Sequence, residues 1–259
     1  MPSIAADILA KAILPTPLKS DTIRVFWSDE IRRRAFFSAR TTEAKYLDIL
    51  RTMCADVAEG RMDNATARKK LRAALSGFGV EFQGEDRNLV DLASRRRLDL
   101  IVDTQRQMAH GAAAAAVQGR GEALAAFPAW RLERYGTRAE PRDWTRRWRE
   151  AGNAVGWEGA CRADFVALKG SPIWEALGQG AGGFTDTLGN PYPPFAFSSG
   201  MGWTPVRRGD CARYGLDPDE ATGGNPTLSP GQEDIRRAAE RLSPEMRARL
   251  VAGLKKAGA

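Results

Sequence analysis

The sequence predicts an α+β fold that is predominantly α, with long N-terminal helices, a smaller irregular α+β region with a Trp/Pro-rich loop, and a C-terminal helical tail. Two observations lead to this prediction. Apolar residues recur at helical spacing through most of the first half of the chain. After Phe127, prolines, glycines and tryptophans replace that spacing. The expected divisions are an N-terminal arm (1–27), a helical region (28–126), an α+β region (127–216), a linker (217–231) and the tail (232–259).

The helical region is expected to begin after an irregular stretch. Residues 1–25 contain Pro15 and Pro17, which suggests an arm or a linker. Ser28 is a candidate N-cap, since its hydroxyl can accept a free N–H of the first helical turn. From there the apolar spacing predicts one long helix of about seven turns, or two abutting helices, that closes at Gly60.

Two further helices are expected in the first half. Asp63 or Asn64 is placed to cap one of them. The other is predicted to begin near Asp86 and to include the alanine run at 112–116, because alanine has the highest helix propensity. His110 falls in this helix, and we expect a hydrogen-bonded helical residue there, since no adjacent serine or cysteine suggests a nucleophile.

The second half is expected to contain shorter elements. Residues 130–135 alternate in polarity, which predicts a strand. Residues 141–151 suit a short helix that carries Trp144 and Trp148. Residues 185–203 are rich in proline and glycine, and they are expected to form an ordered loop because proline interrupts helices.

The tail has a strong helix start signal at 243–245, Ser-Pro-Glu, which supplies a cap, a proline at the first helical position and an acid in the first turn. Its apolar residues form a single stripe that needs a partner surface on this chain or on another. We predict that this stripe docks to a partner through Leu242, Met246, Leu250 and Leu254.

Composition excludes several classes of protein. The 259 residues include 39 basic and 32 acidic side chains, for a net charge of +7. No apolar run approaches the ~20 residues that span a bilayer, so we expect no membrane partner. Three well-separated cysteines argue against a disulfide framework and a four-ligand zinc site, and a single histidine excludes sites that need a histidine pair. We therefore predict no catalytic residues, cofactor, metal or small-molecule substrate.

The basic residues offer one candidate contact surface. Arginines and tryptophans interleave between residues 130 and 157, a mixture that suits phosphate contact but is also typical of tryptophans in a core with arginines covering them. Both interpretations stay open from the sequence alone. The candidate DNA or partner contacts are Arg131, Arg134, Arg142, Arg146, Arg147 and Arg149.

Five blocks of sequence occur in an order that resembles phage head-morphogenesis proteins, the family of minor head protein F of phage Mu. We call them the motif blocks: 98–107, 127–131, 141–144, 167–174 and 189–201. The resemblance extends over about residues 30–216. It implies structural roles for Asp103, Thr104, Arg106, Trp130, Trp144, Trp174, Pro193, Pro194 and Gly200.

Two departures from the family bear on metal binding. Many relatives carry a histidine near the position of Phe165 and cysteines in the Pro-Pro loop, where this chain has Ser198 and Ser199. We therefore expect no zinc site to be shared with the family.

The resemblance implies a non-enzymatic minor capsid protein of a tailed bacteriophage. Such a protein is assembled in the cytoplasm of the host bacterium and resides in the virion head. The resemblance implies that it assists head assembly near the portal and DNA packaging or delivery. The implied partners are the portal and major capsid proteins and packaged double-stranded DNA, which would be contacted without sequence preference.

Two other classes of function are open from the sequence. The arginines would also suit a DNA-binding regulatory protein, which would read base edges and so show sequence preference. An effector enzyme such as a toxin-like transferase would need a further catalytic domain, and we expect too little room for one after Leu216.

Overall fold

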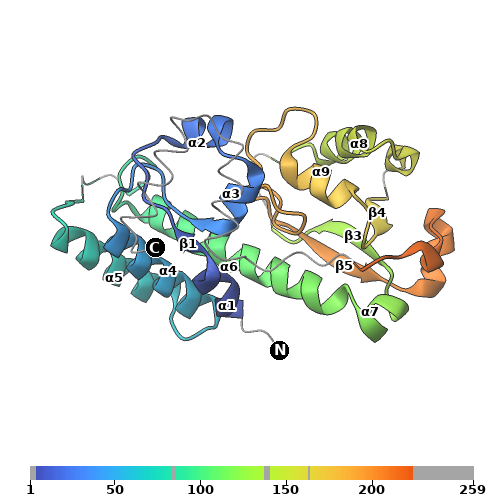
Figure 1. Ribbon diagram of the computed structural model, residues 1–259, viewed down its shortest axis with the longest axis horizontal. Helices are drawn as coiled ribbons and strands as arrows, with labels where there is room; N and C mark the ends of the chain where they lie inside the picture. Colours follow the sequence, from blue (N-terminus) through green and yellow to red (C-terminus); the bar gives the residue numbers. More distant parts are fainter. Residues whose placement is uncertain (1–3, 83, 85, 137–140, 163, 224–259) are drawn as a thin grey trace. The chain divides into compact units, whose positions relative to one another are not determined.

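The computed structural model of the chain describes residues 4–82, 84, 86–136, 141–162 and 164–223. Within these residues the fold is α+β and mostly helical, which confirms the predicted fold class (Figure 1). The chain divides into two compact units, and the boundary between Ala109 and His110 lies inside helix α6. The boundary predicted between residues 126 and 127 lies too late in the chain, because the second half of α6 belongs to unit 2.

Unit 1 is mainly helical. Besides its helices it contains two parallel strands of two residues each, β1 and β2, which pair with each other. Its core lies between α1, α4, α5 and the first half of α6. The elements are α1 (Ile4–Ala10), β1 (Ala12–Ile13), α2 (Ser20–Phe26), α3 (Asp29–Arg34), β2 (Ala35–Phe36), α4 (Ala44–Ala58), α5 (Asn64–Gly77) and α6 (Arg95–Gln118) up to Ala109.

The described residues before position 28 are not an arm. Helix α1 packs on α4, and Ile8 and Leu14 have exposed fractions of 0% and 1%. Thr16 forms a β-bridge with Thr41, so the prolines on either side of it shape a turn within unit 1. The prediction of an arm was wrong because proline marks a break in regular structure and does not distinguish a linker from a packed turn.

The predicted helix between Ser28 and Gly60 is interrupted. Helix α3 ends at Arg34, strand β2 follows, and α4 begins only at Ala44. Phe36 is fully buried in the core of unit 1, and pairing with β1 holds its backbone extended. Apolar spacing alone did not reveal this break, because tertiary pairing overrides local helical preference.

The helix starts agree with the sequence in two cases and differ in a third. Ser28 Oγ accepts the Ile31 N–H at 3.3 Å, and Asp63 Oδ1 accepts two N–H groups of the first turn of α5 at 2.9 Å. Helix α6, however, begins at Arg95 rather than near Asp86. Asp86 instead accepts the Arg95 N–H at 3.1 Å across the intervening turns.

Unit 2 contains an antiparallel three-stranded sheet with the strand order β4-β3-β5. Helices α8 and α9 pack together over the core on one face (Figure 1). The predicted strand at 130–135 and helix at 141–151 are present, each shifted slightly. The elements are the second half of α6, α7 (Gly121–Ala126), β3 (Ala129–Arg134), α8 (Trp144–Ala154), η1 (Glu158–Cys161), β4 (Val166–Leu168), α9 (Ile173–Gln179), β5 (Met201–Val206), η2 (Arg208–Tyr214) and η3 (Pro218–Glu220).

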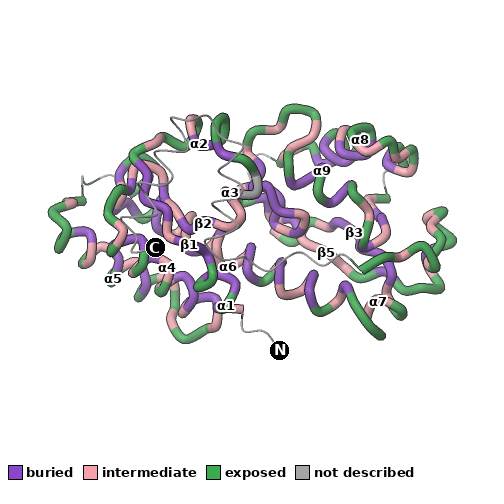
Figure 2. The backbone as a smooth tube through the Cα atoms, in the orientation of Figure 1, coloured by how far each residue is buried: buried purple, intermediate pink, exposed green. Residues whose placement is uncertain are grey.

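The two faces of this sheet bury different side chains. Trp130 and Leu132 face the core below α8 and α9, whereas Ala129 and Val206 pack with Cys211 of η2 on the other face. Figure 2 shows the buried stretches of the sheet next to α9. The alternation follows from the strand geometry, in which successive side chains point to opposite faces.

The end of the chain is described only up to Gly223. Part of the predicted linker is regular, since η3 begins behind the Asp217 cap. The predicted apolar stripe at Leu242, Met246, Leu250 and Leu254 lies outside the described residues. No helix among the described residues is long and apolar enough to cross a membrane.

Candidate functional site

The motif blocks of unit 2 meet in one aromatic core through Trp130, Trp144, Trp174 and Phe195, and Trp148 and Trp203, which lie outside the blocks, complete it. Trp130 comes from β3, Trp148 from α8, Trp174 from α9, and Trp203 from β5. The ring centroids of Trp130 and Trp203 lie 4.5 Å apart in a stacked pair, and Trp174 lies 5.3 Å from Trp148 and 5.4 Å from Trp203 in edge-on pairs. Such geometries are favourable for aromatic rings. Blocks distant in sequence therefore build one packing unit.

Trp174 is at the centre of this core. Its exposed fraction is 2%, and its ring also stacks on Phe195 at 6.1 Å. The indole N–H donates to the Leu168 carbonyl at 2.9 Å. This carbonyl points away from β3, at the outer edge of β4. The Trp174 side chain therefore fills the core and also donates a hydrogen bond to the edge of the sheet.

The Pro-rich loop is positioned by close backbone contacts. Gly111 of α6 lies against the Pro193 carbonyl, and Gly178 of α9 lies against the backbone of Asn190, so that a Cβ atom at either glycine would clash. At the far end of the loop, Gly200 has a φ of 66° and lies against Gly136. Glycine is needed at these positions because only a residue without a side chain permits such approach.

Inside the loop, buried polar groups are held by the backbone of the loop itself. The Ser199 hydroxyl donates to the Pro194 carbonyl and accepts the Met201 N–H at 3.1 Å. Asn190, which is fully buried, donates its amide to the Tyr192 carbonyl. The loop is thus an ordered part of the core, as the sequence predicts, and the motif residues Pro193, Pro194 and Gly200 have structural positions in it.

Lys169 forms a polar junction between the motif blocks and the end of α6. Its Nζ donates to the Gln118 carbonyl at 2.7 Å and to the Ala123 carbonyl at 3.4 Å. The ammonium also lies 4.4 Å from the centre of the Trp130 ring. Burial lowers the pKa of Lys169 from its usual value to about 8. The contacts explain why a lysine suits this position, although the sequence analysis did not single it out.

Two of the six candidate arginines share one carboxylate within unit 2. Arg142 Nε and Arg147 Nη2 each lie 2.7 Å from the Asp186 carboxylate, and Arg142 also donates to the Phe197 carbonyl at 2.7 Å. Arg147 lies 4.2 Å from the centre of the Phe184 ring. These arginines join α8 to the loop, and they are less available to DNA than the sequence suggested.

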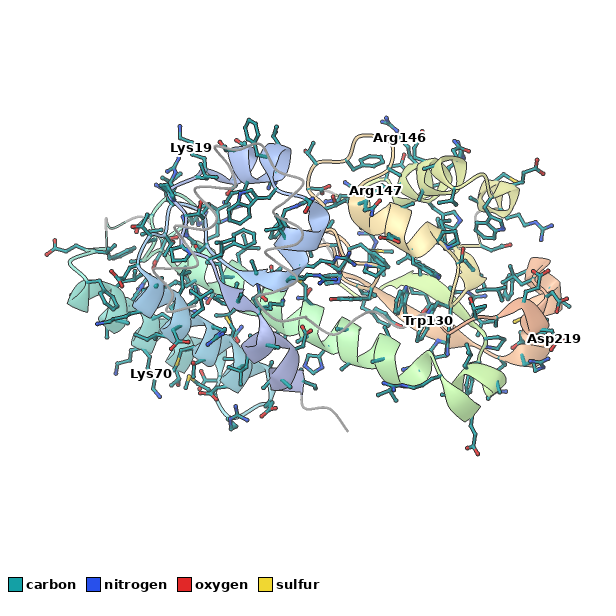
Figure 3. All side chains as sticks on the ribbon, in the orientation of Figure 1. Lys19, Lys70, Trp130, Arg146, Arg147 and Asp219 are labelled. Carbon is teal, nitrogen blue, oxygen red and sulfur yellow. The ribbon has the colours of Figure 1, made fainter. Side chains whose placement is uncertain are left out.

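The other four arginines differ in exposure. Arg131 donates to the Tyr214 hydroxyl and lies 3.8 Å from Glu133, so it is tied to the sheet face. Arg134, Arg146 and Arg149 are exposed. Figure 3 shows Arg146 beside Arg147 at the top of unit 2. Since Arg146 and Arg149 lie one turn apart on α8, they share one side of the helix and form the basic face of α8.

Of the two interpretations of residues 130–157, the structure favours a tryptophan core covered by arginines over a surface for phosphate contact. Trp130, Trp144, Trp148 and Trp174 have exposed fractions of at most 5%. Charge adds to this argument, because residues 110–223 carry 13 basic and 13 acidic side chains, whereas residues 1–109 carry 19 and 15. The net positive charge lies outside the described part of unit 2.

The first motif block has its own contacts in unit 1. Asp103 accepts the amide of Asn64 at 2.8 Å, and Arg106 lies 3.7 Å from the same carboxylate. One helical turn earlier, Asp99 pairs with Arg68 at 2.5 Å. Thr104 is buried. The acids of this block therefore hold α5 against α6.

The sequence analysis missed a buried polar pair beside this block. Lys11, with an exposed fraction of 2%, donates to Gln105 Oε1 at 2.9 Å and lies 4.0 Å from Asp7. Burial lowers the pKa of Lys11, and the nearby Asp7 carboxylate opposes this shift. Cys54 is buried next to it, and desolvation raises the pKa of its thiol to about 12. A lysine inside an apolar N-terminal run was the signal that could have indicated a folded segment.

The β5 edge of the sheet of unit 2 is partly protected. Pro205 has no N–H and pairs with Trp130, so β5 directs the backbone groups of Met201, Trp203 and Pro205 away from β3. The Met201 N–H donates to Ser199, and the Trp203 carbonyl accepts the Tyr135 hydroxyl at 3.2 Å. Addition of a partner strand is thus disfavoured, and partner contacts would use helix and loop surfaces.

Comparison with known proteins gives no match: no protein-family model, curated protein or solved structure matches the chain. Among the described residues, no group of three or more His, Cys, Asp or Glu side chains is placed to hold a metal ion. The functional interpretation thus depends on the sequence resemblance and on the geometry of unit 2.

Proposed function

We propose that this protein is a non-enzymatic minor capsid protein of the head-morphogenesis type, made in the cytoplasm of a bacterial host and built into the head of a tailed bacteriophage near the portal. The observation that supports this proposal is the convergence of four motif blocks on one tryptophan core. In unit 2 the tryptophans that carry the resemblance are packing residues, which is the structural role that the resemblance implies for them.

This arrangement suits an assembly role. The core, the glycine contacts and the partly protected β5 edge make unit 2 a defined body with a fixed surface, which lowers the entropy lost on docking to a larger particle. In this proposal the portal and major capsid proteins are the partners of that surface.

The experiment is recovery of the tagged protein with phage particles. The chain would be expressed in a host together with the phage genes that surround it, and particles would be separated on a density gradient. We expect the protein to sediment with procapsids or portal assemblies. Recovery of only free monomer, while particles form normally, would contradict the proposal.

DNA contact is a second element of the proposal, and it concerns the basic face of α8. Arg146 and Arg149 are exposed and can approach phosphates, whereas Arg142 and Arg147 share Asp186. Two phosphate contacts would give a modest affinity with a logarithmic salt slope of about −2. We expect Arg146→Ala with Arg149→Ala to remove this binding, and the matched change Thr145→Ala with Asn153→Ala, also exposed on α8, to leave it.

Competition distinguishes this role from that of a DNA-binding regulator, which the same two arginines also favour. A capsid protein that meets packaged DNA would be displaced equally by unrelated duplexes, because phosphate contacts carry no sequence information. A regulator would prefer one sequence by roughly a thousandfold or more. Strong preference for one duplex would favour the regulator over the capsid protein.

A further inference from the structure

Unit 1 exposes several large apolar side chains in one short stretch. Phe78, Phe82, Leu89 and Val90 have exposed fractions of 38%, 40%, 41% and 56%. We call these four residues the 78–90 patch. The described residues of this stretch form no helix or strand. Several exposed apolar side chains close together in the chain are candidates for a surface that a partner covers.

Two arginines contact this stretch and the residues that follow it. Arg72 lies 4.4 Å from the centre of the Phe82 ring and donates to the Ala93 carbonyl at 2.8 Å. Arg97, which is buried, donates to the Leu89 carbonyl at 3.1 Å and to Ser38 at 2.8 Å. Phe82 and Leu89 of the patch are therefore tied to α5 and α6 of unit 1.

The same chain contains an apolar stripe that fits such a surface. Leu242, Met246, Leu250 and Leu254 recur every four residues, so on a helix they lie along one side over about 18 Å. A helix of this kind binds by inserting its i, i+4 and i+8 side chains into an apolar surface. We propose that the segment 232–259 docks its stripe on the 78–90 patch of its own chain.

Reach and tethering favour this occupant over a second molecule. Between Gly223 and Leu242 the chain supplies 18 residues, which extend to roughly 60 Å. This length is more than twice the radius of gyration of about 13 Å of a compact unit of about 100 residues, so the segment is long enough to fold back onto its own chain. Covalent connection through a short tether also gives an effective concentration in the millimolar range, far above that of a free second copy.

Charge predicts how this contact responds to salt. Residues 224–259 carry 7 basic and 4 acidic side chains, and residues 1–109 are also net basic. The two parts therefore repel weakly at long range, and apolar burial must hold the contact. Added salt screens the repulsion, so docking should persist or strengthen, whereas DNA binding weakens.

Hydrogen exchange in the full-length protein tests the proposal. Met246→Ser with Leu250→Ser removes the centre of the stripe, and Ala248→Ser with Ala252→Ser is the matched control off the stripe. We expect the first variant to raise amide exchange in residues 78–94 about tenfold, and the control to leave it unchanged. Val90→Ser in the patch should raise exchange in residues 242–254 to a similar degree, whereas Phe26→Ser, at an exposed residue of α2, should not.

Crosslinking identifies the occupant. In a Cys161→Ser background, which removes the exposed native thiol, Val90→Cys with Leu250→Cys should give an intrachain disulfide on mild oxidation. A crosslink formed only between chains would show that a second copy occupies the patch and would overturn the proposal. The proposal would also be overturned if amide exchange in residues 78–94 stayed the same when the stripe is removed. It would be overturned as well if the stripe protected only the amides of α2 from exchange.

Discussion

Replacing Trp174 with alanine should strongly destabilise unit 2. The substitution removes a side chain that is 2% exposed, and with it ring contacts to Trp148, Phe195 and Trp203. Truncation of a buried tryptophan costs about 3 to 5 kcal/mol. Loss of the hydrogen bond to the Leu168 carbonyl adds about 1 kcal/mol, since that acceptor is left without the indole.

The assay is urea unfolding of the full-length protein, followed by tryptophan fluorescence. With a slope of about 2 kcal/mol per molar urea, a loss of 4 kcal/mol lowers the midpoint of unit 2 by about 2 M. Trp174→Phe keeps an aromatic ring and loses the hydrogen bond, so it should cost roughly half as much. Tyr135→Ala, at a ring that is 66% exposed, is the control and should cost about 1 kcal/mol or less. A loss below 1 kcal/mol for Trp174→Ala would show that the packing described here is wrong.

Three further predictions concern the contacts around this core. Gly111→Ala places a methyl group against the Pro193 carbonyl and should cost about 1 to 3 kcal/mol in urea unfolding, whereas Gly77→Ala, where the site is open, should be neutral or slightly stabilising. Burial lowers the pKa of Lys169 to about 8, below the 10.5 of a free lysine, so the unfolded chain binds more protons between these values. The free energy of unfolding should therefore rise between pH 8 and 10.5, and Lys169→Met should remove this contribution; equal pH dependence of the two proteins would contradict the assignment. Asp186→Asn leaves Arg142 and Arg147 side by side without their carboxylate and should lower stability by about 2 kcal/mol, measured by thermal unfolding, and an unchanged melting temperature would show that the pair contributes nothing.

Local features of the sequence determined several elements of the fold. The caps at Ser28 and Asp63 are side chains next to the N–H groups that they accept, so residue type and position suffice to predict them. The strand at β3 follows from alternating polarity, and the loop at 185–200 follows from proline chemistry. The aromatic core was one of two interpretations of residues 130–157. The spacing of the tryptophans shows which side chains can pack, but it does not show which side chains they pack against.

Contacts between distant residues decided the rest. Pairing of β1 with β2 breaks the apparent helix at Ala35, and α1 is folded because Ile8 and Lys11 find partners on α4 and α6. Arg142 and Arg147 read as free basic residues in the sequence, yet they meet Asp186, which lies 39 residues beyond Arg147. Propensity and periodicity act over a few residues, whereas strand pairing, burial and charge neutralisation depend on which segments the fold brings together.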